Sequence, residues 1–301
     1  MNRLFIGWLS GVLLLASGSA HAALRIFACE AEWGALAKEL TGDTASIYTA
    51  TTAQQDVHHI QARPSLIAQA RRADLVVCTG ADLEVGWLPL VLRRAGNPGV
   101  QVGTSGYFAA ADYVHLLEKP QRLDRAEGDV HAQGNPHIQL DPHNILRVAE
   151  ALGQRLVELD PAHTDDYRRY VQDFTARWQA AIQRWEQQAA PLKGMPIVVY
   201  HRGWTYLNHW LGLRELAELE PLPGVPPTSS HLAGVLAAMK TQPARAIIRA
   251  TYQDSRPVDW LHDHTGIPAL ELPSTVGGNK QAADLFGFFD NIIAQLLGVN
   301  A

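Results

Sequence analysis

Short apolar runs alternate with longer amphipathic stretches along most of the chain. This alternation is typical of βαβ units, in which helices cover a sheet of parallel strands. In the first half, strands are predicted at residues 24–29, 45–50, 74–79 and 100–103, with helices at 32–41, 64–72 and 83–95. In the second half, strands are predicted at 196–200, 246–249 and 269–272, with helices at 231–241 and 284–297.

A long helical period separates the two halves. Between Pro161 and Pro191, large apolar and aromatic residues recur at intervals of three and four, and no glycine or proline interrupts them. A helix of about 28 residues is roughly 42 Å long, so it would run along a whole domain and join two lobes stiffly. We therefore predict an α/β fold of two Rossmann-like lobes with parallel sheets, residues 23–160 and 192–301, joined by one rigid helix at 161–191.

The N-terminus has the pattern of a secretory signal peptide. Arg3 precedes an apolar run over residues 4–16, and Ala20-His21-Ala22 supplies the small residues that signal peptidase requires. We predict cleavage after about residue 22 and a mature protein that is free in the periplasm. The alternative, an N-terminal anchor helix, is disfavoured because the apolar run is short for a membrane span.

Charge and cysteine content narrow the function classes. The 301 residues carry a net charge of −5 with no basic stripe, which argues against nucleic acid and anionic membrane surfaces as partners. The two cysteines, Cys29 and Cys78, each close a predicted strand. If those strands are parallel neighbours, the sulfurs lie at one end of the sheet, and an oxidising compartment favours a disulfide. Two buried thiols are the alternative.

Thirteen histidines make metal binding a candidate chemistry. His58 follows the predicted strand 45–50 by one loop, His201 directly follows the strand 196–200, and His137 precedes a helix that opens near Asp141. Ligands of parallel sheets bind outside the carboxyl ends of the strands, and three neutral imidazoles suit tetrahedral zinc. The spacing alone is weak evidence, since for any one of these residues it favours a capping or core histidine over a metal ligand.

Four motifs in order along the chain strengthen the metal hypothesis. The motifs are DVHHIQARPS (56–65), ADLVVCTGADLEVGWL (73–88), GNPHIQLDP (134–142) and VVYHRGWTYL (198–207). Together they resemble the zinc-binding solute-binding proteins of bacterial ABC importers, the TroA- and ZnuA-like cluster A-I superfamily, and most of all its Azt-type members. The resemblance implies two α/β lobes joined by a long helix, with a metal ion between them. It also implies that His58, His137 and His201 are the first, second and third ligands.

The resemblance leaves the fourth ligand open. Many relatives carry an aspartate after the last strand, whereas residues 274–278 here read STVGG. We nominate Asp284, whose alternative role is to cap the last helix. Water or a histidine of the predicted loop 115–135, such as His131, could take this position instead. Asp141 could orient an imidazole or cap a helix.

The predicted function is capture of Zn²⁺ as transported cargo and its delivery to the membrane permease of an ABC importer. A histidine in the third position favours zinc over manganese, because manganese-type relatives place a carboxylate there. We expect a monomer that is no enzyme, loaded either directly or by a periplasmic zinc metallochaperone. The main alternative is a secreted zinc hydrolase with a three-histidine site, which would need a general base, and no glutamate adjoins these histidines in sequence. A structural or adhesin-like zinc protein is a third possibility.

Overall fold

The computed structural model describes residues 23–120, 128 and 131–300 and contains two four-stranded parallel sheets. The first sheet has the order β2-β1-β3-β4, and the second has the order β6-β5-β7-β8. The first comprises β1 (Leu24–Ala28), β2 (Ala45–Thr49), β3 (Leu75–Cys78) and β4 (Tyr107–Ala109). The second comprises β5 (Pro196–Val199), β6 (Arg214–Glu218), β7 (Ala246–Ala250) and β8 (Ala269–Leu272).

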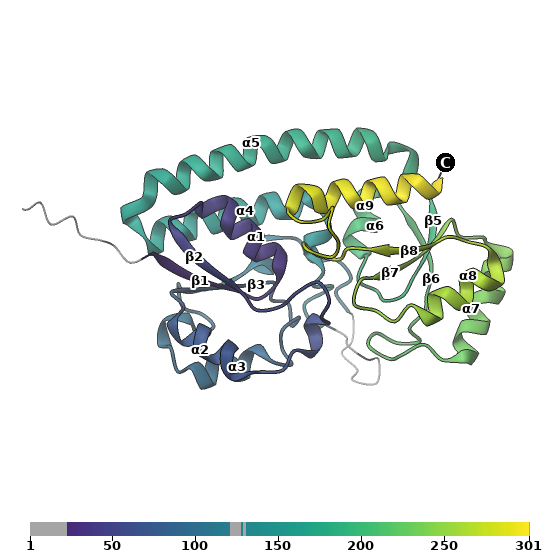
Figure 1. The fold of residues 1–301 in the computed structure, drawn as a ribbon, viewed down its shortest axis with the longest axis horizontal. Coiled ribbons are helices and arrows are strands. Elements are labelled where there is room, and N and C mark those ends of the chain that lie inside the picture. The colour runs from purple at the N-terminus through teal and green to yellow at the C-terminus, as the bar shows by residue number, and fades with distance from the viewer. Residues whose placement is uncertain (1–22, 121–127, 129–130, 301) are drawn as a thin grey trace, which may run out of the picture.

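Helices cover both sheets, as the alternation of apolar and amphipathic segments predicts (Figure 1). The first lobe contains α1 (Ala31–Thr41), α2 (Pro64–Arg72), α3 (Leu88–Ala95) and α4 (Pro142–Leu159). The second contains α6 (Thr205–Leu211), α7 (Ser229–Thr241), α8 (Arg256–Thr265) and α9 (Leu285–Asn300). Helix α1 shows how the sequence selects this packing, because Trp33, Leu36, Ala37 and Leu40 form one fully buried stripe.

Helix α5 (Thr164–Ala189) is 26 residues long and extends along both lobes (Figure 1). Its Trp178 and Trp185 are fully buried, and their rings lie 5.6 Å and 5.0 Å from the ring of Phe289 in α9. Trp178 also donates its Nε1–H to the carbonyl of Pro142 at the start of α4. Aromatic pairs of this kind contribute about 0.5–1.5 kcal/mol each beyond their buried area. The helix is therefore attached to the second lobe by packed aromatic side chains and to the first lobe by the hydrogen bond of Trp178.

The predicted fold class of two parallel α/β lobes and one long helix is confirmed. The lobe boundaries stay a prediction, since α9 follows the second sheet yet also contacts α1 of the first lobe. The predicted signal peptide, residues 1–22, lies outside the described residues. Within the described ranges, no helix is both long and apolar enough to cross a lipid bilayer.

The strand predicted at 100–103 is wrong. Residues Pro98–Val100 form a 3₁₀ turn, and the fourth strand comes later, at β4. Gly99 and Gly103 flank Val100, and Gly103 adopts a φ of 88°, which favours a turn over an extended strand. The helix predicted at 83–95 begins only at Leu88, because Ala81 and Asp82 have positive φ angles and form a turn.

Candidate metal centre

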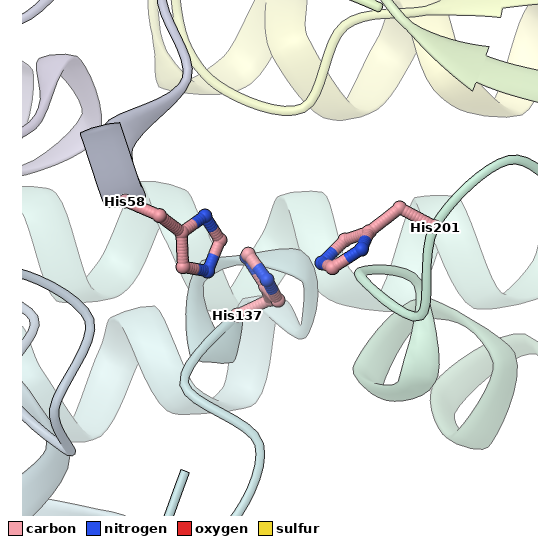
Figure 2. Close-up of side chains that lie close together, drawn as sticks. All are labelled: His58, His137 and His201. Carbon is pink, nitrogen blue, oxygen red and sulfur yellow. The ribbon is translucent and has the colours of Figure 1, made fainter. Parts of the chain in front are cut away.

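Three histidines from distant segments of the chain lie together (Figure 2). His58 lies in the 3₁₀ turn Val57–His59 after β2, His137 immediately precedes the turn Ile138–Leu140, and His201 comes two residues after the end of β5. The ring centroids are 5.4 Å apart for His58 and His137, 5.7 Å for His58 and His201, and 5.5 Å for His137 and His201. One nitrogen from each ring lies within 4.8 Å of the other two, so the three rings can contact a single cation.

The histidine cluster is shielded from solvent. His137 and His201 are each 8% exposed, and the His58 side chain is also 8% exposed. The Nε2 atom of His58 is buried and has no hydrogen-bond partner among the described residues. A buried polar atom without a partner costs about 1–3 kcal/mol. A cation bound by the three rings would remove that cost.

Carboxylates orient two of the three rings. Asp56 Oδ1 lies 2.9 Å from His58 Nδ1, and the same oxygen accepts the backbone N–H of His58 at the start of its 3₁₀ turn. Glu220 Oε2 lies 2.7 Å from His201 Nδ1. When a carboxylate accepts a hydrogen bond from Nδ1–H, Nε2 is left as the ligand atom, and this arrangement is common behind zinc-binding imidazoles.

The surroundings shift the pKa values of two cluster histidines in opposite directions. Burial, followed by the neighbouring His58 and His201, holds the pKa of His137 well below its ordinary value. Burial alone would lower the pKa of His201 too, but the hydrogen bond and charge of Glu220 outweigh burial and raise it. The hydrogen bonds with His58 and His59 similarly outweigh burial at Asp56 and lower the pKa of that carboxyl group. His137 is therefore neutral and able to bind a cation at neutral pH. His201 holds its proton to a higher pH than an ordinary imidazole, and that proton must leave before the ring can bind a cation.

Replacing Glu220 with alanine is expected to weaken binding of a divalent metal ion by about 10- to 100-fold, because the His201 ring loses the partner that fixes its orientation and tautomer. Competition with a chromogenic chelator at pH 7.5 measures the effect. Glu220→Gln keeps a hydrogen-bond acceptor and should recover part of the loss. Glu271→Ala removes a carboxylate paired with Arg249 and serves as the control. Equal affinities for Glu220→Ala and the wild type would refute the orienting role.

The side chain of Asn135 joins the two loops that carry His137 and His201. The Nδ2 atom of Asn135 donates to the carbonyl of Arg202 at 2.9 Å, and its Oδ1 accepts the backbone N–H of His137 at 3.1 Å. A Cβ atom built on Gly203 would lie 3.3 Å from the His201 ring and 3.6 Å from the His137 ring. Glycine at this position therefore keeps the space beside the two rings free.

The nomination of Asp284 as the fourth ligand is not supported by the structure. Asp284 is exposed, does not belong to the histidine group, and accepts the backbone N–H of Gly287 at 2.8 Å. It is thus the cap of α9, the alternative role considered from the sequence. Asp141 likewise accepts the backbone N–H of His143 and caps α4.

A fourth histidine lies beside the cluster. The ring centroid of His131 is 5.4 Å from that of His58. His131, His137 and His201 also line a common cavity of about 180 Å³. The neighbouring His59 is exposed and lies 3.0 Å from Asp56 Oδ2. Of the two, His131 is therefore the one placed to contact an ion near the other rings.

Sequence reasoning missed several carboxylates around the centre. Glu220 follows His201 by 19 residues and has no motif that marks it. Glu30 and Glu32 line a second cavity together with His137 and His201. Asp56 is the one of these carboxylates that the sequence could have indicated. It lies two residues before His58, and an acidic side chain at this spacing can form a hydrogen bond with the imidazole ring.

The predicted disulfide between Cys29 and Cys78 is present in the structure. Strands β1 and β3 pair in parallel, so the residues that follow them lie at one end of the sheet. Both cysteines are fully buried. The bridge fixes the start of the two loops that carry Glu30 and Glu84.

Comparison with known proteins identifies the family. The family model described as the periplasmic component A of the zinc-uptake complex, ZnuA, matches residues 26–298. The chain belongs to this family. The ZnuA-like resemblance of the sequence motifs is thereby confirmed, whereas the assignment to the Azt-type members stays a prediction.

Relatives and solved structures agree with this membership. The manganese ABC transporter substrate-binding lipoprotein PsaA of Streptococcus pneumoniae is 22% identical over 274 residues, which is 88% of this chain and 85% of the relative. The metal ABC transporter substrate-binding lipoprotein FimA of Streptococcus parasanguinis is 22% identical over 273 residues, with the same coverage. A crystal structure of ZnuA superposes with a TM-score of 0.77 at 20% identity, covering 93% of this chain and 100% of that one. At this identity the superposition establishes the shared fold alone.

Proposed function

We propose that this substrate-binding protein of the metal ABC transporter class captures zinc outside the cytoplasm and delivers it to the membrane permease of an importer. The observation that carries the proposal is the convergence of His58, His137 and His201 within 4.8 Å. Two of these residues come from the first lobe and one from the second. An ion held by all three would therefore hold the lobes together, which gives a permease a means to release it.

The donor atoms favour zinc over manganese. Three imidazole nitrogens suit a borderline-soft ion with tetrahedral geometry, whereas manganese prefers an octahedral set of oxygen ligands. A relative with manganese in its name matches 88% of this chain in sequence, so the choice of ion rests on this chain's own side chains. We propose His131 or water as the fourth ligand, because the His131 ring lies next to that of His58.

Metal analysis combined with competition titration tests the proposal. Protein purified without added metal and then titrated should bind one zinc ion tightly, and manganese should compete poorly for the same site. Manganese binding as tight as zinc would refute the zinc assignment. The zinc-loaded protein should also leave ester, peptide and β-lactam substrates unchanged. Turnover that disappears upon chelation would favour the secreted hydrolase instead.

Zinc affinity is expected to fall as the pH falls. The pKa of His201 is raised, so its proton competes with zinc at a higher pH than an ordinary imidazole would. The pKa of His137 is lowered, so this ring stays neutral and adds little competition. Below the pKa of His201, the loss should be about tenfold per pH unit for each proton displaced. Chelator competition between pH 8 and pH 5.5 measures the slope, and a flat profile would contradict the sign.

The remaining predictions concern location and partners. Export through a cleaved signal peptide, a monomeric state and loading by a periplasmic metallochaperone stay predictions. Mass spectrometry of the mature N-terminus and sedimentation of the purified protein would test the first two.

A further inference from the structure

A second cavity, here called the inner cavity, adjoins the histidine cluster. It has a volume of about 40 Å³ and is lined in part by Glu30, Glu32, Gln139, His137 and His201. A buried cavity needs about 10–15 Å³ of this kind of volume to hold one water molecule. The inner cavity therefore has room for one ion together with one or two waters.

The wall of the inner cavity is rich in buried carboxyl groups. Glu30 and Glu32 are 2% and 1% exposed, and Glu84, 3% exposed, lies behind Glu30. No lysine or arginine lines the cavity in the described part of the chain. Burial, followed by the charges of Glu84 and Glu32, holds the pKa of Glu30 well above its ordinary range, and burial raises the pKa of Glu32 to about 7. Such groups require protons or a cation to compensate for their burial.

Two buried oxygen atoms on the wall accept no hydrogen bond from a described donor, although the Glu30 carboxyl group also faces that of Glu84. Glu30 Oε2 accepts the backbone N–H and the hydroxyl of Thr79, both at 3.2 Å, but Glu30 Oε1 is buried and unpaired. The Nε2 atom of Gln139 donates to the carbonyl of Ser274 at 3.1 Å, which leaves its buried Oε1 unpaired. Native proteins rarely leave buried polar atoms unsatisfied. Both residues line the inner cavity, so a single occupant could satisfy both oxygens.

We propose that the inner cavity is a second cation site, distinct from the histidine centre, which binds a hard divalent cation through Glu30, Glu32 and Gln139. Carboxylate and amide oxygens with water are the ligands that such ions prefer. Glu32 is held in place by a hydrogen bond from the Thr275 hydroxyl. Gln139 is held by Ser274 of the same segment. The occupant therefore connects α1 of the first lobe with the segment that follows β8 of the second.

Manganese is the probe for this site, because its electron paramagnetic resonance signal reports free and bound ion separately. The full chain carrying His58→Ala, His137→Ala and His201→Ala lacks the nitrogen centre. It should still bind one manganese ion. Adding Glu32→Gln to this variant should weaken manganese binding by about 10- to 100-fold. Glu215→Gln is the matched control, since Glu215 is also a largely buried carboxylate but does not line the inner cavity.

Zinc-saturated wild-type protein supplies a second measurement that needs no histidine substitution. It should bind one further manganese ion, giving two metals per chain by elemental analysis. Absence of manganese binding at millimolar concentration in both experiments would overturn the proposal. A single ion per chain whose zinc affinity falls in Glu32→Gln would also overturn it, because Glu32 would then be a ligand of the histidine centre. Either result would leave the proposed function standing, because both still allow zinc to bind at the three histidines.

Discussion

Replacing His201 with alanine is expected to lower zinc affinity by about 10²- to 10³-fold. Zinc bound by four protein ligands gains about 10–16 kcal/mol, so one ligand contributes about 3 kcal/mol. His201 is the one cluster histidine that comes from the second lobe, and its loss also leaves Glu220 without its imidazole partner. Competition titration against a high-affinity chelator at pH 7.5 measures the change.

The control for this experiment is His264→Ala, which removes an exposed imidazole whose Nδ1 pairs with the carbonyl of Trp260. Its zinc affinity should match that of the wild type. His58→Ala and His137→Ala should show losses similar to that of His201→Ala. If the three single variants kept wild-type affinity, the ion would bind elsewhere and the proposed function would fail.

Among the substitutions considered, removal of the Cys29–Cys78 disulfide is expected to lower the free energy of unfolding the most. The bridge closes a loop of 49 residues, and the loop-entropy relation gives about 4 kcal/mol for a loop of this length. For a chain of this size that corresponds to a decrease in Tm of roughly 8–16 °C. Scanning calorimetry of the metal-free Cys29→Ala, Cys78→Ala double variant measures it.

Reduction of the wild-type protein provides an independent route to the same state. Because both sulfurs are fully buried, the reductant has to act on partly unfolded protein, and the Tm after reduction should approach that of the double variant. A double variant that melts within about 2 °C of the oxidised wild type would show that the unfolded chain gains little freedom.

The sequence predicted the elements whose pattern is strong. The spacing of three and four between large apolar residues predicted α5. Tyr167, Phe174, Trp178 and Trp185, which belong to this pattern, are all buried in the structure. Strand β6 was missed because RELAE carries three charged residues, which an edge strand tolerates but a hydrophobic pattern does not show. Helix α8 was missed for a similar reason, because only Val258 and Leu261 of its ten residues are buried.

Only those residues of the candidate centre that stand next to a predicted strand or motif could be predicted from the sequence. His58 and His201 were found because each follows a strand at the carboxyl end of its sheet. Asp284 lies outside the histidine group in the structure, because the sequence does not reveal which of several nearby polar side chains points inward. The contact between Glu32 and Thr275 joins residues 243 positions apart, and no local pattern predicts such a pair.

Helix α5 restricts how far the two lobes can separate. One continuous helix runs along both lobes, and its aromatic contacts with α9 restrict its bending. Separation of the lobes would therefore have to bend a helix that is packed along its length. Elastic strain then grows from the smallest opening, and the metal-free and metal-bound forms should have nearly equal radii of gyration. Release of an ion bound as proposed would consequently require a partner that applies force to both lobes, and the cleft should close again once that force ends.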